Sequence, residues 1–387
     1  MHRSLILSLI ALSLAAVVFA APTVVVNGNV STVSAIEANG KIYVDPVALM
    51  QLLGGKATYD AATHKVMINS TAPAGGGGAA ANPANWGTAQ MPGDSGAIGQ
   101  VYSIRKDEPL YFRLNSAEFT TEQVVIGEAM RAPKADEKLL VLHFSVQNPA
   151  KDERLLRWDS LKFTVVDAMN VNHETDADWG DEQSHQRVEI QLKPAQRLDL
   201  FTVFTVPAQG AIPKLIVQPP TDNDGPVLRY DLRDIVKGLQ PPVADPADAS
   251  GATALQLVPA PFNAPCPLQD YTVTLEKTEY VTTALGDDTP DEGERFLTAA
   301  LRIKRASPAD GVLRGDSLQP VLAGEDGVEL RYRDMIGATG AQAVDQDIKS
   351  GQELRVRLYF TVPKDATPKT LTLKEGESRA YQFAIPK

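Results

Sequence analysis

The sequence contains two copies of one pattern, separated by about 157 residues. The tripeptide Asp-Ser-Leu occupies residues 159–161 and again residues 316–318, 157 positions later. The tetrapeptide Phe-Thr-Val-Pro occupies residues 204–207 and again residues 360–363, 156 positions later. A single spacing over so long a unit indicates a duplicated domain rather than a solenoid of short repeats. A function that depends on one copy alone must then lie in residues that the copies do not share.

Both copies carry the strand pattern of a β-sandwich. Residues 100–237 contain a series of short segments in which apolar and polar residues alternate, separated by turn residues, which is typical of sandwiches. Residues 268–387 repeat these segments in the same order. No helical pattern of about 10–15 residues alternates with the strands, so a parallel α/β fold is excluded. We therefore predict a mainly β protein with two tandem sandwich domains.

The first 20 residues have the form of a secretory signal. His2 and Arg3 precede an apolar run, and the small residue Ala20 ends it as a signal peptidase requires. We predict cleavage after Ala20 and export to the periplasm or cell surface, with an uncleaved membrane anchor as the alternative. The remaining chain has no apolar run of transmembrane length, so the mature protein is predicted to lack a membrane span. The formal net charge of −11, without a basic cluster, excludes nucleic acid as a partner.

Residues 21–70 carry the signals of a small α+β module. Two Asn-Gly pairs, at residues 27–28 and 39–40, are strong turn signals between apolar segments. A short helix is expected to follow Asp45, which is suited to cap its first turn, and to end at Gly54. A further hairpin is expected to close the module.

This module resembles the copper amine oxidase N-terminal-like domain. The resemblance rests on the strings V-N-G, N-G-K-I-Y-V-D-P-V-A-L, L-L-G-G-K-A-T-Y-D and H-K-V-M-I within residues 24–69. That family has Pro directly after Tyr-Val, whereas Asp45 intervenes here. The two repeats are similar in layout to immunoglobulin-like domains of unknown function that accompany such stalk modules on secreted bacterial proteins. Together the resemblances imply a non-catalytic stalk, two immunoglobulin-like β-sandwiches, a bacterial cell-envelope location and no cofactor.

Two segments have the composition of linkers. Residues 71–99 contain four consecutive glycines followed by three alanines, with prolines around them, which predicts a flexible linker. Residues 238–267 are rich in Pro and Ala, which predicts a semi-stiff spacer between the repeats. The single cysteine, Cys266, lies at the end of this spacer. We expect an unpaired thiol there, with an intermolecular disulfide as the alternative.

An acidic loop in the first repeat is the candidate metal site. Carboxylates on one loop are suited to Ca²⁺, and two histidines with carboxylates are suited to Zn²⁺. The loop does not have the spacing of an EF-hand, and the second repeat is nearly uncharged at the equivalent place. The interpretation that we favour is a solvated hairpin loop whose charges prevent edge pairing. The candidate ligands are Asp176, Asp178, Asp181, Glu182 and His185, with His173 on the other flank.

The motif Gly-Asp-Ser-Gly at residues 93–96 also surrounds the nucleophile of trypsin-like proteases. A protease requires a histidine base and an aspartate as well, and in the mature chain only His64 precedes this motif. We therefore predict a non-enzymatic envelope protein with a structural, adhesion or protein-interaction role. Its expected partners are envelope proteins or surface polymers. The alternative is an extracytoplasmic protein that binds calcium or a small ligand.

Overall fold

The computed structural model describes residues 95–386, except 107, 176–177, 221–224 and 226, together with five strands nearer the N-terminus. The chain divides into two compact units, Met1–Ala81 and Asn82–Lys387. In the first unit, β1, β2 and β3 form an antiparallel sheet, and β4 pairs with β5, as the turn signals predict. The helix expected after Asp45 lies outside the described residues, so the α part of the predicted α+β module is not supported. The strands of this unit are β1 (Thr23–Val26), β2 (Asn29–Ala38), β3 (Lys41–Val44), β4 (Lys56–Asp60) and β5 (Lys65–Asn69).

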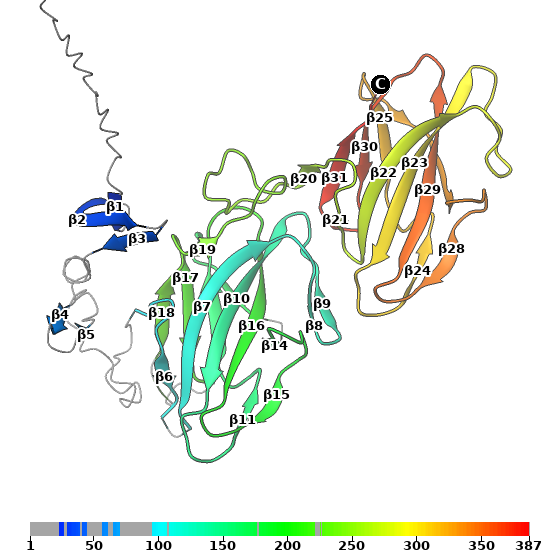
Figure 1. Cartoon of the computed structure of the whole chain (residues 1–387). Coiled ribbons are helices and arrows are strands. Elements are labelled where there is room, and N and C mark those ends of the chain that lie inside the picture. Colours follow the sequence, from blue (N-terminus) through cyan, green and yellow to red (C-terminus); the bar gives the residue numbers. More distant parts are fainter. Residues whose placement is uncertain are drawn as a thin grey trace, which may run out of the picture. The chain divides into compact units, whose positions relative to one another are not determined.

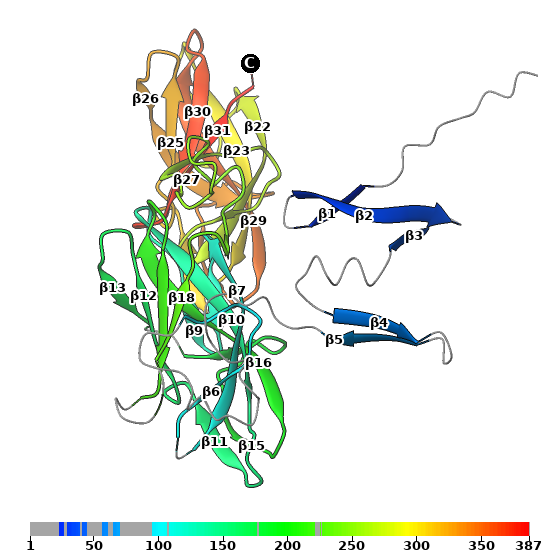
Figure 2. The same ribbon diagram turned by 90° about the vertical axis from the view of Figure 1, so that its left-hand side faces the viewer.

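The second unit contains two β-sandwiches, as predicted (Figures 1 and 2). Sandwich 1 has one sheet in the order β14-β16-β10-β7-β19, with β6 also on β7, and a second in the order β13-β12-β17-β18. Two small ribbons, β8-β9 and β11-β15, complete it. Its strands are β6 (Tyr102–Ile104), β7 (Leu110–Thr120), β8 (Val124–Ile126), β9 (Ala129–Arg131), β10 (Glu137–Gln147), β11 (Arg154–Arg157), β12 (Lys162–Val166), β13 (Asn172–Glu174), β14 (Gly180–Asp181), β15 (Glu189–Leu192), β16 (Arg197–Pro207), β17 (Lys214–Gln218), β18 (Leu228–Asp231) and β19 (Val236–Lys237).

Sandwich 2 repeats this topology. Its sheets run β21-β22-β23-β29-β27 and β20-β31-β30-β25-β26, beside the ribbon β24-β28. The central trio β22-β23-β29 corresponds to β7-β10-β16 in order and direction. The strands are β20 (Leu257–Pro259), β21 (Cys266–Pro267), β22 (Tyr271–Val281), β23 (Glu294–Arg305), β24 (Gly311–Arg314), β25 (Val321–Gly324), β26 (Glu329–Leu330), β27 (Tyr332–Gly337), β28 (Asp345–Ile348), β29 (Glu353–Pro363), β30 (Pro368–Leu373) and β31 (Ala380–Ala384).

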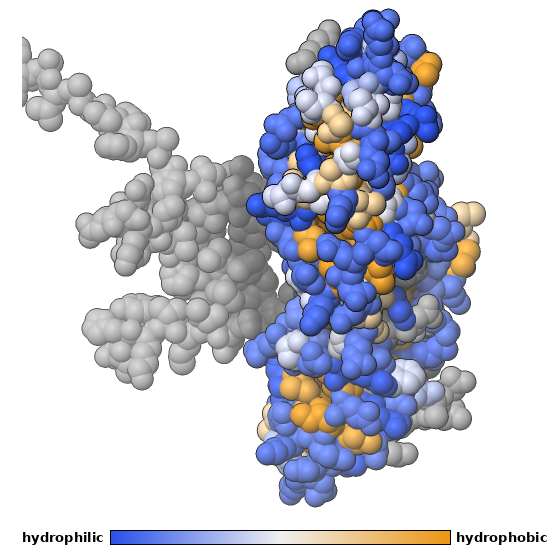
Figure 3. All heavy atoms as spheres, turned by 90° about the vertical axis from the view of Figure 1, so that its right-hand side faces the viewer, coloured by the Kyte–Doolittle hydropathy of each residue, from blue (hydrophilic) through white to orange (hydrophobic). Residues whose placement is uncertain are grey.

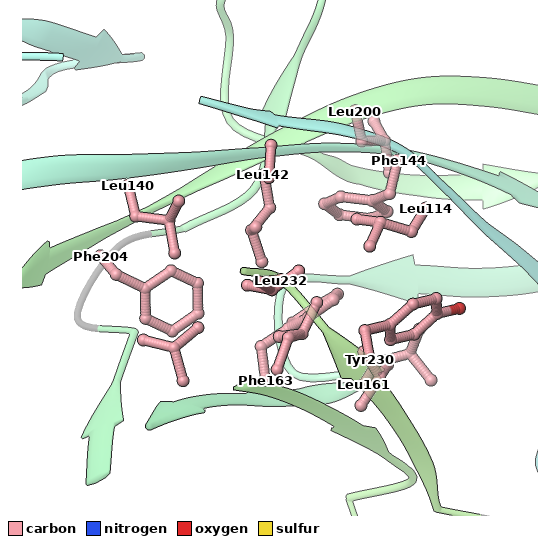
Figure 4. Packing of buried hydrophobic residues seen from close by; sticks show 14 of the residues in the cluster. Leu114, Leu140, Leu142, Phe144, Leu161, Phe163, Leu200, Phe204, Tyr230 and Leu232 are labelled. Atoms are coloured by element: carbon pink, nitrogen blue, oxygen red, sulfur yellow. The ribbon is translucent and has the colours of Figure 1, made fainter. Parts of the chain in front are cut away.

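The period-two pattern of the strands explains the core of each sandwich. In β10, Leu142 and Phe144 are fully buried, and Figure 4 shows them facing Phe163 and Tyr230 of the opposite sheet. Residues between them in the sequence, such as His143, lie on the outer face because successive side chains of a strand alternate. Each sandwich also has a small outer apolar cluster, around Phe201 in sandwich 1 and around Tyr359 in sandwich 2.

The two motifs shared by both copies, Asp-Ser-Leu and Phe-Thr-Val-Pro, have structural roles. The Ser160 hydroxyl accepts a hydrogen bond from the backbone N–H of Arg157, and the Ser317 hydroxyl accepts one from Arg314, at 3.0 and 2.9 Å. Both serines therefore close the same turn at the end of β11 or β24. Both copies of Phe-Thr-Val-Pro end a central strand with a fully buried phenylalanine. Both motifs therefore support the fold, and a functional site must be sought among other residues.

The predicted spacer at 238–267 is instead folded onto both sandwiches. Ala252 and Ala254 belong to the core of sandwich 1, whereas Val258 and Cys266 belong to the core of sandwich 2. The predicted linker also ends earlier than residue 99, because the N–H of Gly96 donates to Arg229 O at 2.7 Å. Most of residues 71–99 lie outside the described part. In segment 238–267 the small residues Gly251, Ala252 and Ala254 are buried, whereas most of its prolines stay exposed.

No helix in the described part of the chain is long and apolar enough to cross a membrane. One face of the second unit is mostly hydrophilic, with small separate hydrophobic areas (Figure 3). Scattered apolar residues of this kind are normal on protein surfaces.

Candidate functional site

The structure places the predicted metal ligands in different local roles. Asp176 lies outside the described residues. The Asp178 carboxylate lies 3.3 Å from Arg187 Nε. Asp181 Oδ1 accepts hydrogen bonds from the backbone N–H groups of Gln183 and Ser184, at 3.1 and 2.8 Å. These bonds, led by that from Ser184, hold the pKa of Asp181 below its usual value.

The remaining two candidates turn toward the sheet. Glu182 Oε1 lies 2.6 Å from His143 Nδ1, and the ring of His185 packs edge-on against Phe201 with the centroids 5.3 Å apart. His173 lies beside Asp167, with its Nε2 3.0 Å from a carboxylate oxygen. Among residues 95–386 that the structure describes, no three His, Cys, Asp or Glu side chains are arranged to hold a metal ion.

Trp179 explains why this loop is not simply a solvated hairpin. Its side chain is fully buried and packs T-shaped against Phe144 and Phe163, with centroids 5.2 and 5.7 Å away. The next residue must be glycine, since a Cβ on Gly180 would lie 2.4 Å from the ring of Phe201. The Trp-Gly pair is the sequence signal that identifies this part of the loop as core.

His143 is the centre of a row of ionisable groups on the outer face of sandwich 1. Its Nδ1 faces Glu182, and its Nε2 lies 3.6 Å from Glu118 Oε1. Lys237 Nζ lies 2.9 Å from the other oxygen of Glu118 and, by hydrogen bonding, holds the pKa of Glu118 below its usual value. The two carboxylates flank opposite sides of the imidazole ring, so the row joins strands and does not form a ligand pocket.

The junction of the two sandwiches contains the strongest concentration of buried charge. Arg379, which precedes β31 and is 2% exposed, donates through Nη2 to the carbonyl oxygens of Glu137 and Ala135 at 2.6 and 3.3 Å. Its Nε donates to the carbonyl of Leu255. One side chain of sandwich 2 therefore binds the backbone of sandwich 1 and of the connecting segment. Burial lowers the pKa of this guanidinium.

Lys138 holds the connecting segment against sandwich 1. Its fully buried ammonium group donates to Gly210 O at 2.6 Å, to Ala208 O at 3.3 Å and to the carbonyl of Ala252 in the connecting segment. Phe119 supplies a ring whose centroid lies 4.4 Å from Nζ. Burial lowers the pKa of Lys138 to about 8. Three acceptors and a ring offset part of the cost of burying this charge.

Glu375 binds the backbone of the segment that begins β22 in sandwich 2. One of its oxygens accepts hydrogen bonds from the backbone N–H groups of Gln269, Asp270 and Tyr271, at 2.9, 2.8 and 3.3 Å. Burial raises the pKa of this carboxyl to about 7. Gln123 of sandwich 1 donates to the carbonyls of Leu268 and Tyr271 at 3.0 and 3.1 Å, so the same segment is also held from the other sandwich.

A cleft of about 380 Å³ lies at this junction, lined by five prolines of the connecting segment together with Phe119 and Tyr381. Cys266 also lines the cleft, but its side chain is 1% exposed. Burial raises the pKa of this thiol to about 12, which leaves it protonated at neutral pH and unreactive. An intermolecular disulfide through Cys266 would require this part of the core to open.

Comparisons with known proteins give no family. No protein-family model matches the sequence, and no curated protein matches it. Among solved structures, an uncharacterized β-sandwich protein from Clostridium difficile is 15% identical, covering 33% of this chain and 95% of its own, with a TM-score of 0.28. A conserved hypothetical protein from Bacillus anthracis is 13% identical, covering 31% of this chain and 92% of its own, with a TM-score of 0.25. The assignment of β-sandwiches therefore rests on the strand pairing itself.

Proposed function

We propose that this chain is a secreted, non-enzymatic protein of the bacterial cell envelope with a structural, adhesion or protein-interaction role. The supporting observation is that its buried charged side chains bind backbone groups. Lys138, Arg379 and Glu375 each bind backbone groups that join one segment to another. Catalytic sites instead direct such groups at a nucleophile or substrate. Arg379, which links the two sandwiches, and two charges that fix segments within each sandwich suit a protein whose task is to hold surfaces in a fixed arrangement.

The finer domain assignment is part of this proposal. The sandwiches are taken to be immunoglobulin-like modules, and residues 21–70 a stalk of the copper amine oxidase N-terminal-like type. A stalk before two joined sandwiches suits a protein that presents binding surfaces outside the cell.

Cell fractionation with crosslinking tests this role. In cells that produce the protein, the chain should fractionate with the envelope and crosslink to an envelope protein or polymer. The variant Arg379→Met, in which the sandwiches lose their main fastening, should yield less of the same crosslinked product. Recovery in the cytosol, or turnover of a hydrolase substrate by the purified chain that Glu375→Gln abolishes, would contradict the proposal.

A further inference from the structure

The duplication places a cation over an aromatic ring at the same end of both sandwiches. Lys138 Nζ lies 4.4 Å from the centroid of Phe119, and Arg295 Cζ lies 3.7 Å from the centroid of Tyr280. Each cation is the second residue of its strand, β10 or β23, and each ring is the last but one of β7 or β22. The strand registers agree, since Phe119 pairs with Leu140 and Tyr280 pairs with the equivalent Leu297.

Both cations also bind the loop that follows Phe-Thr-Val-Pro. Lys138 donates to the carbonyl of Gly210, and Arg295 Nη2 donates to the carbonyl of Ala366 at 3.3 Å. The loops are anchored in the same way, because the N–H of Ala208 and the N–H of Lys364 each donate at 2.8 Å to the carbonyl of the residue that precedes the cation's strand, Asp136 or Gly293. The cation, the ring and the loop therefore form one platform that occurs twice.

The two platforms differ in what covers them. In sandwich 1, the N–H of Ala254 donates to Ala208 O at 2.8 Å, and the carbonyl of Ala252 accepts from Lys138. This covering segment leaves Phe119 only 7% exposed. In sandwich 2, Tyr280 is 40% exposed, and Lys364, the equivalent of Ala208, is exposed.

The open platform also has unused hydrogen-bonding capacity. Within the described part of the chain, Arg295 Nε is buried and makes no hydrogen bond. The platform lies where β22 runs into β23, at the end of sandwich 2 away from β21 (Figure 1). A buried N–H without an acceptor is unfavourable, and a shift of the Arg295 side chain toward a bound segment would let a carbonyl oxygen of that segment accept from it.

We propose that the platform of Tyr280, Arg295 and Ala366 binds an extended polypeptide segment of small residues through its backbone carbonyl oxygens. The segment 250–254, Ser-Gly-Ala-Thr-Ala, covers the equivalent platform of sandwich 1 and is the guide to this partner. The exposed acidic residues Asp287 and Glu292 of the adjoining loop favour an uncharged or basic partner over an acidic one. This inference rests on the proposed interaction role and specifies the partner's chemistry.

A peptide with the sequence of residues 249–257, which is uncharged, tests the proposal. Titrated with the full chain and followed by fluorescence anisotropy, the labelled peptide should bind saturably with a Kd of about 0.1–1 mM, since an unstructured peptide must be ordered on binding. Arg295→Ala should weaken binding about tenfold or more, which corresponds to about 1.4 kcal/mol. Arg295→Lys should restore most of it, because sandwich 1 uses lysine at this place.

Lys304→Ala is the matched control, because Lys304 is an exposed cation at the other end of the same strand. Its binding should equal that of the unmodified chain, and all variants should first show the unmodified thermal unfolding profile. An absence of saturable binding overturns the proposal, as does equal binding by Arg295→Ala. Envelope association that persists while peptide binding fails would overturn this inference and leave the proposed function standing.

Discussion

At the scale of single residues, two tryptophans in the same sandwich have opposite environments. Trp179 is fully buried among Phe144 and Phe163, whereas Trp158, beside the Asp-Ser-Leu turn, is 44% exposed. Trp179→Ala should lower the free energy of unfolding by about 3–5 kcal/mol, because it opens a large cavity. Trp158→Ala should change it by about 0.5 kcal/mol or less. Urea unfolding curves of both variants check this, and equal losses would contradict the assignment of Trp179 to the core.

Lys138 gives a residue-scale prediction for pH dependence. Its pKa is about 8 in the folded chain, against 10.5 for an ordinary lysine. Between these values the unfolded chain binds more protons, so stability should rise with pH through this window. The rise due to Lys138 should be about 2 kcal/mol between pH 7.5 and pH 9.5. Urea unfolding at the two pH values should show a rise in stability for the unmodified chain that is smaller by this amount in Lys138→Met. The same pH dependence in both proteins would refute the assignment of the rise to Lys138.

At the scale of elements, the duplicated turn before the third long strand of each sandwich offers an internal control. Gln196 and Gln352 each accept a bond at 2.9 Å from the N–H of the lysine three residues earlier. The preceding residue has positive φ in both turns, 60° at Ala195 and 72° at Gly351. That conformation costs roughly 1 kcal/mol for a residue with a Cβ, partly offset by the greater freedom of unfolded glycine.

Exchanging these residues should therefore have opposite effects. Gly351→Ala should lower the midpoint of thermal unfolding, whereas Ala195→Gly should raise it slightly. The corresponding changes in the free energy of unfolding should be about 1 kcal/mol or less in each direction. If both substitutions destabilise to a similar extent, packing rather than backbone conformation decides these positions.

The elements also show how far the sequence predicts the structure. Alternation in long strands such as β10 and β16 is a local property, so the sandwiches and the place of His143 on an outer face could be predicted. The burial of Trp179 and of segment 238–267 depends on contacts with distant strands, which local composition does not reveal. The placement of Glu182 beside His143 of another strand depends on a contact of the same kind.

At the scale of the whole molecule, the central claim concerns the second unit, in which two similar sandwiches are fastened by buried polar contacts. Arg379 binds two carbonyl groups of sandwich 1 across the junction and one of the connecting segment, and Gln123 binds two carbonyl groups of sandwich 2 from the other side. Hydrogen bonds to a charged group contribute about 1.5–3 kcal/mol each, and loss of Arg379 would leave buried carbonyls unpaired. The two sandwiches should therefore unfold together.

Differential scanning calorimetry of the full chain tests this claim most directly. The unmodified chain should unfold its sandwich pair in one cooperative transition, and Arg379→Met should separate it into two. Arg355→Met, which removes an exposed arginine from β29, should behave like the unmodified chain. Two transitions in the unmodified chain, or a single unshifted transition in Arg379→Met, would contradict the account.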